Sequence, residues 1–72
     1  MILEKPTKRS ITIAGHATSI SLEPSFWAAL SDMAASQNMS LTDMIAEIDE
    51  RPRNSSLTSA LRVAVLNWAR GT

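Results

Sequence analysis

The sequence contains no cysteine and a single histidine, His16, so it offers neither a disulfide nor the ligand set of a structural zinc site. It also has only two glycines and no glycine-rich phosphate loop. No apolar run approaches the roughly 20 residues that cross a bilayer, and the N-terminus lacks the apolar core of a secretory signal. We therefore expect a cytoplasmic protein that holds no metal or cofactor and contacts no membrane.

Side-chain arrangements that support catalysis are also missing from the sequence. His16 stands beside Gly15 in an expected turn, with no cysteine or second histidine to join it. Asp43, Glu47 and Glu50 recur at helical spacing and form one solvated stripe, away from the apolar surroundings that catalytic carboxylates need. No serine lies in a nucleophile-elbow motif. We expect no catalytic residues and no enzymatic activity.

Charge of neither sign predominates, because seven basic and seven acidic side chains cancel. Net charge alone therefore does not indicate a nucleic-acid partner. The distribution is uneven, since Lys5, Lys8 and Arg9 cluster near the start of the chain and acidic residues gather between residues 43 and 50. A chain of 72 residues forms at most one domain and buries little surface. We expect a second copy to complete the interior, and no stable folded monomer.

Two short segments, residues 9–14 and 17–22, alternate between apolar and polar residues, which is typical of half-buried strands. The dipeptide Gly15-His16 suits a two-residue type II′ hairpin turn between them. That turn would place Ile11 opposite Ile20. The hairpin would then have an apolar side (Ile11, Ile13, Ile20, Leu22) and a hydroxyl side (Ser10, Thr12, Ser19, Ser21). Alternatively, the first segment is an arm that becomes ordered only on a partner.

The apolar spacing then changes from two residues to the 3.6-residue period of helices. Pro24 suits the first turn of a helix, and Asn38 is a candidate for its left-handed C-terminal residue. Ser40 is placed as the N-cap of a second helix. A third helix can start at residues 54–56 and run to about residue 70, where Gly71 would end it. The sequence predicts three helices after the strands.

The stretch from Ala17 to Ile48 combines a strand, a proline-started helix and a serine-capped helix. This order resembles the ribbon-helix-helix family, which includes the Arc and MetJ repressors. The runs GHATSISLEPSFWAAL and MSLTDMIAEID are similar to small bacterial members with an added C-terminal helix. The resemblance implies a mainly α fold with a short N-terminal β ribbon, in an intertwined homodimer. It also implies that the ribbon enters the major groove of double-stranded DNA.

Candidate site residues follow from the resemblance and from the charge pattern. Positions expected to face the bases are Ala17, Ser19 and Ser21, joined by Ser10 and Thr12 if the first segment belongs to the sheet. Expected phosphate contacts are Ser40, Leu41 and Thr42 at the start of the second helix, with Lys5, Lys8 and Arg9 on the arm. The expected dimer core consists of Ile20, Leu22, Phe26, Leu30, Leu41, Ile45 and Ile48.

Two functions of different class remain open. The first is a dimeric DNA-binding transcription regulator, in which residues 1–8 are a flexible arm, 9–50 the core and 51–72 a C-terminal helix extension. The second is a homo-oligomerisation or protein-partner module that has lost DNA binding, with the third helix contacting another chain. The short side chains of the ribbon distinguish them, because the family usually carries a basic residue where Ala17 stands. Pairing of dimers into tetramers stays open for either function.

Overall fold

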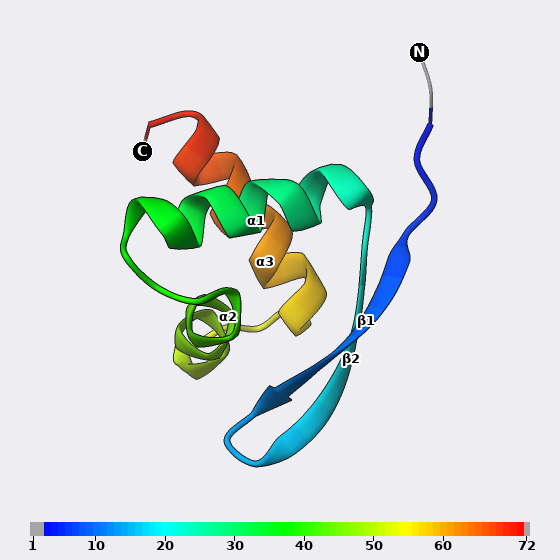
Figure 1. Ribbon diagram of the computed structural model, residues 1–72, viewed down its shortest axis with the longest axis vertical. Coiled ribbons are helices and arrows are strands. Elements are labelled where there is room, and N and C mark those ends of the chain that lie inside the picture. Colours follow the sequence, from blue (N-terminus) through cyan, green and yellow to red (C-terminus); the bar gives the residue numbers. More distant parts are fainter. Residues whose placement is uncertain (1–2, 72) are drawn as a thin grey trace.

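The computed structural model describes residues 3–71, in which an N-terminal hairpin lies beside three helices (Figure 1). The elements in chain order are β1 (Thr7–Ile13), β2 (His16–Leu22), α1 (Pro24–Ser36), α2 (Leu41–Glu50) and α3 (Leu57–Ala69). In Figure 1, α3 passes behind α1, and the twisted hairpin runs from the start of α1 toward α2. The predicted mainly α fold with an N-terminal β ribbon is confirmed.

The hairpin turn lies one residue earlier than predicted. Ala14 and Gly15 form it with φ values of 51° and 82°, the positive pair that a type I′ turn requires. Ile11 therefore pairs with Thr18, and the predicted pairing of Ile11 with Ile20 is wrong. Because the register differs by two residues, and side chains alternate with a period of two, every side chain keeps its expected face.

The inner face of the hairpin supplies one wall of the core. Ile13, Ile20 and Leu22 are buried there, and Ile11 is half-buried. The first segment thus belongs to the sheet and pairs with β2 of its own chain. Strand β1 begins at Thr7, before the segment that the alternation indicated, so Thr7 and Lys8 of the expected arm lie in a strand. Met1 and Ile2 of that arm lie outside the described residues.

Helix α1 begins immediately after β2 because Pro24 occupies its first turn, where a missing N–H costs nothing. The carbonyl of Glu23 accepts hydrogen bonds from the N–H groups of Phe26 and Trp27. At the other end, Asn38 adopts the predicted left-handed conformation with φ of 56°. The buried face of α1 consists of Trp27, Leu30, Met33 and Ala34.

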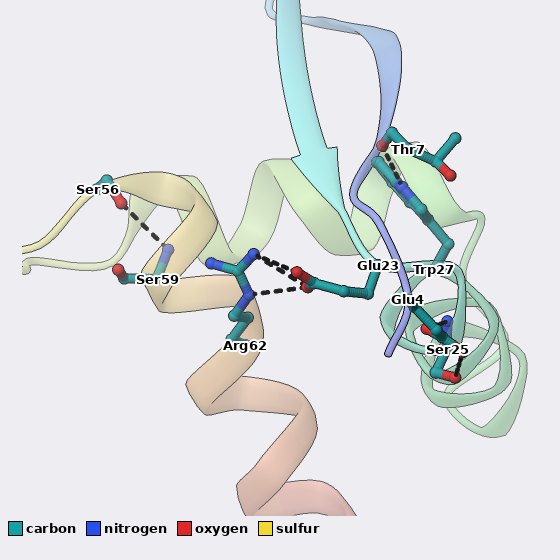
Figure 2. Close-up of polar contacts among 8 residues, drawn as sticks. All are labelled: Glu4, Thr7, Glu23, Ser25, Trp27, Ser56, Ser59 and Arg62. Carbon is teal, nitrogen blue, oxygen red and sulfur yellow. Dashed lines mark hydrogen bonds and ion pairs between the residues drawn. The ribbon is translucent and has the colours of Figure 1, made fainter. Parts of the chain in front are cut away.

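Serine N-caps start the other two helices. The Ser40 hydroxyl accepts a hydrogen bond from the N–H of Asp43 at 3.0 Å. Figure 2 shows the second cap, in which the Ser56 hydroxyl accepts a hydrogen bond from the N–H of Ser59 at 3.1 Å. Gly71 follows α3 with φ of 75°, as predicted. Met44, Ile45 and Ile48 of α2 and Leu61 and Val65 of α3 complete the core. None of the described helices is long and apolar enough to cross a membrane.

A single chain already buries most residues that were expected in a dimer core. Buried are Ile20, Leu22, Leu30, Ile45 and Ile48, whereas Phe26 and Leu41 are half-buried. Their burial therefore does not require a second copy, since helix α3 covers part of the surface that two chains were expected to share. The homodimer and the division of the chain into arm, core and extension stay predictions.

The fully buried Leu61 gives a direct test of this packing. We expect Leu61→Ala to lower the free energy of unfolding by about 2–5 kcal/mol, because it removes transfer energy and leaves a cavity. Val63→Ala on the same helix is the control, since Val63 is 55% exposed, and should change stability by no more than about 0.5 kcal/mol. Urea denaturation measures both. Equal losses would contradict the placement of α3.

Candidate nucleic-acid interface

The hairpin presents one exposed, hydroxyl-rich surface, which we call the outer face. Residues directly opposite in an antiparallel pair share a face, and the three pairs here are Lys8–Ser21, Ser10–Ser19 and Thr12–Ala17. All six residues are exposed. The structure thus brings the five residues predicted to face bases together on one surface. Lys8 joins them, although it was predicted to lie on a flexible arm.

The pairing pattern also shows which backbone groups are free. Ile13 and His16 flank a two-residue turn, so their backbone N–H and C=O groups bond to each other. Every second pair along the hairpin from there is hydrogen-bonded in the same way. The N–H and C=O groups of Ala17, Ser19 and Ser21 then point to the free edge of β2. On β1, the corresponding groups of Lys8, Ser10 and Thr12 point to the opposite free edge. The outer face therefore lies between two unpaired backbone edges.

Arg9 does not belong to the outer face. It pairs with Ile20, and so lies on the inner side of the hairpin. Its guanidinium group lies over the Trp27 ring, 4.8 Å from the ring centroid, which is within the range of a cation–π contact. The structure therefore separates Arg9 from Lys8, with which it was grouped as a phosphate contact. Lys5 is exposed and precedes β1.

Polar contacts fix the start of β1 against α1. The indole N–H of buried Trp27 donates to the carbonyl oxygen of Thr7 at 2.9 Å (Figure 2). The Glu4 carboxylate accepts hydrogen bonds from the N–H of Ser25, at 3.0 Å, and from the Ser25 hydroxyl. These two bonds to Ser25 lower the pKa of Glu4 below its ordinary value, the hydroxyl having the larger effect. The segment before β1 is thereby attached to the first turn of α1.

A second contact joins the end of β2 to α3. The Arg62 guanidinium group donates to both oxygens of the Glu23 carboxylate, at 3.0–3.3 Å (Figure 2). Arg62 also lies over the Phe26 ring, 5.8 Å from its centroid. The pKa of Glu23 is lowered, first by a hydrogen bond from its own backbone N–H and then by Arg62. No pattern in the sequence indicated this ion pair, because its partners are 39 residues apart.

The N-terminus of α2 has the form of the predicted phosphate contact. The N–H groups of Leu41 and Thr42 lie in the first helical turn, where the helix supplies no carbonyl acceptor. The Ser40 hydroxyl oxygen accepts a hydrogen bond from the Asp43 N–H, and the Ser40 O–H remains available as a donor. These donors stand at the positive end of the helix dipole. The exposed Asp43 carboxylate is in the same turn and partly offsets that potential.

Comparison with known proteins agrees with this architecture. The family model described as the ribbon-helix-helix domain matches residues 6–69. The chain belongs to the ribbon-helix-helix family. Members of this family are generally DNA-binding transcription regulators, and the fold is not an enzymatic one. The matched range includes α3, so the third helix is part of this family's domain.

A solved structure supports the same assignment. It is that of an uncharacterized protein from Bordetella pertussis Tohama I, which is 35% identical to this chain and matches it with a TM-score of 0.79. The match covers 93% of this chain and 58% of that one, so this chain spans less than two thirds of its relative. A search of curated proteins found no match.

The lowered pKa values of Glu4 and Glu23 predict that their contacts stabilise the fold at neutral pH and lose this effect in acid. A carboxyl group with a lowered folded-state pKa stabilises the fold above its ordinary pKa of 4.5 and loses that effect as the pH falls through the lower value. We expect Glu4→Gln and Glu23→Gln to reduce the melting temperature at neutral pH and to match the wild type in acid. Thermal unfolding followed by circular dichroism measures this. Glu50→Gln is the control, since Glu50 is exposed and forms no ion pair within residues 3–71. A difference between Glu23→Gln and the wild type that persists in acid would contradict the assignment.

Proposed function

We propose that the protein is a small dimeric transcription regulator that inserts the outer face of its hairpin into the major groove of DNA. The observation that carries this proposal is the outer face itself, a surface of hydroxyl groups with Lys8 and no carboxylate. Such a surface can approach DNA without burying a negative charge against phosphates. Membership of a family of DNA-binding regulators supports the same function.

The free edge of β2 supports a homodimer as the DNA-binding form. An unpaired strand edge is a template for another strand, and a second copy offers an identical edge across a twofold axis. Pairing β2 with the partner's β2 would satisfy the free backbone groups of Ala17, Ser19 and Ser21. Strand β2 is also the one that leads directly into α1, as expected of the ribbon strand from the resemblance of residues 17–48 to the family.

The side chains of the outer face suit modest base discrimination. The hydroxyl groups of Ser19 and Ser21 can each donate to or accept from base edges. The methyl group of Ala17 can contact the methyl group of thymine. Since the net charge is zero, the sequence-independent attraction to DNA is weak. The donors of Ser40, Leu41 and Thr42 would hold a phosphate beside the groove.

A negative charge placed at the centre of the outer face tests this function. We expect Ser19→Glu to weaken binding to genomic DNA fragments at low salt by at least about tenfold, which is about 1.4 kcal/mol. The added carboxylate would be buried in the groove, where it loses its hydration and is repelled by the phosphates of both walls. Ser31→Glu is the matched control on the exposed surface of α1, and its affinity should stay close to the wild type. Fluorescence anisotropy measures both, and equal affinities of the two variants would contradict the proposed surface.

Sedimentation equilibrium tests the dimer separately. We expect the wild type to sediment as a dimer at micromolar concentration, because two free β2 edges pair. Ser19→Pro should shift this equilibrium toward the monomer, since proline removes the N–H that points to the free edge. Thr12→Pro removes the equivalent N–H on the free edge of β1 and should leave the dimer intact. A wild type that remains a monomer, or a dimer lost only in Thr12→Pro, would contradict pairing through β2.

One observation favours a second function, that of a module for binding another protein. Helix α3 exposes Val63 and Leu66, which are 55% and 51% accessible. Two shallow hollows of about 240 Å³ adjoin it and share the lining residues Ile48, Arg51, Ala64 and Asn67. Arg51 and Arg53, which line these hollows, are paired with Glu47 and Asp49 of α2, so the exposed apolar residues are what this surface offers a partner. A partner that presents an apolar helix face would suit this surface, and a dimer that binds no DNA at low salt would favour this function.

A further inference from the structure

We propose that the two strands of the hairpin have different roles on DNA, with β1 binding the phosphate backbone and β2 facing the bases. This inference rests on the proposed function. It changes the expected roles of Ser10 and Thr12, which were grouped with the base-facing residues. The observation behind it is that β1 is paired within its own chain, on the edge of β2 that faces away from the proposed dimer axis.

A dimer paired through β2 would contain four strands, in the order β1, β2, partner β2 and partner β1. Neighbouring strands lie about 4.8 Å apart. The axes of the two central strands would therefore lie about 5 Å apart, and those of the two outer strands about 14 Å apart. The major groove is about 12 Å wide. The central pair fits between the walls of the groove, whereas the β1 strands lie over the walls themselves.

The groups on β1 match the chemistry of those walls. Lys8 supplies a cation, and Ser10 and Thr12 supply hydroxyl donors, all on the outer face. Their backbone N–H groups point to the free edge of β1, away from the dimer axis. Cations, hydroxyl groups and backbone N–H groups are the usual donors to phosphate oxygens, and such contacts fix position without reading sequence. The inferred ligand of β1 is therefore a row of phosphodiester groups.

The contacts of β1 with α1 suit this role. The Trp27 indole holds the Thr7 carbonyl at 2.9 Å, and Arg9 lies over the same ring. The start of β1 is thus fixed before DNA arrives, so that placing Lys8 at a phosphate requires little ordering of the chain. Arg9 contributes as a positioning residue on the inner side, and it does not contact the groove.

The test separates salt dependence from base discrimination. The probe is a duplex selected by the wild-type protein from a random-sequence pool, together with the same duplex carrying single base-pair changes. Removing one phosphate contact from each chain of a dimer should reduce the slope of log affinity against log salt by about 1.8, at about 0.9 for each contact. We expect this reduction for Lys8→Gln, with discrimination between the duplexes unchanged.

Two comparison variants complete the test. Arg70→Gln removes one positive charge at the end of α3, where Arg70 forms no ion pair within the described residues, and it should leave the slope unchanged. Ser19→Ala should reduce discrimination between the duplexes by at least about threefold, with the slope unchanged. Circular dichroism confirms that each variant is folded.

The remaining outcomes overturn specific statements. An unchanged slope for Lys8→Gln, or a slope reduced equally by Arg70→Gln, would contradict phosphate binding by β1. Discrimination lost in Lys8→Gln but kept in Ser19→Ala would reverse the roles of the two strands. Failure of the wild type to retain any duplex from the pool would overturn the proposed function, and this inference with it.

Discussion

The register of the β1–β2 hairpin decides which of its side chains enter the core and which face outward. The Ala14-Gly15 turn aligns the strands so that apolar side chains share the inner face and Lys8 shares the outer face with small, mostly hydroxyl-bearing side chains. Ile20 and Leu22 then pack against buried side chains of all three helices to form the core. A shift of one residue would exchange the faces, burying hydroxyl groups and exposing the core. The functional surface and the stability of the fold therefore have the same origin.

The polar contacts between hairpin and helices gather at one end of the molecule. Glu4 bonds to Ser25, Trp27 to Thr7 and Arg62 to Glu23, all where the strands meet the start of α1 (Figure 2). The turn at the other end of the hairpin is exposed. The hairpin is consequently fixed to the helices at the end next to α1, and its outer face stays exposed. In many DNA-binding proteins a strongly basic surface supplies much of the affinity for DNA. Since this chain has no net charge, a few well-placed hydrogen-bond donors have to supply that affinity.

Much of this was predictable from the sequence, because each element carries a local signal. Pro24, Asn38, Ser40 and Gly71 marked helix ends through backbone conformation and capping, and alternation separated the two faces of the hairpin. The turn was not predictable, since alanine rarely adopts a positive φ and a two-residue shift leaves the pattern of faces unchanged. Arg9 could have been placed correctly, because it shares the parity of Ile11 and Ile13. The Glu23–Arg62 pair depends on how α3 docks, which no local signal specifies.

Contact between the outer face of the hairpin and DNA can be tested residue by residue. A nuclear magnetic resonance titration of ¹⁵N-labelled protein with a duplex that it binds reports each backbone amide separately. We expect the largest amide chemical-shift changes at Lys8, Ser10, Thr12, Ala17, Ser19 and Ser21, with smaller changes at Leu41 and Thr42. We also expect the amides in the second half of α3 to keep their chemical shifts. Changes concentrated on α3, with the outer face unchanged, would contradict binding through the hairpin.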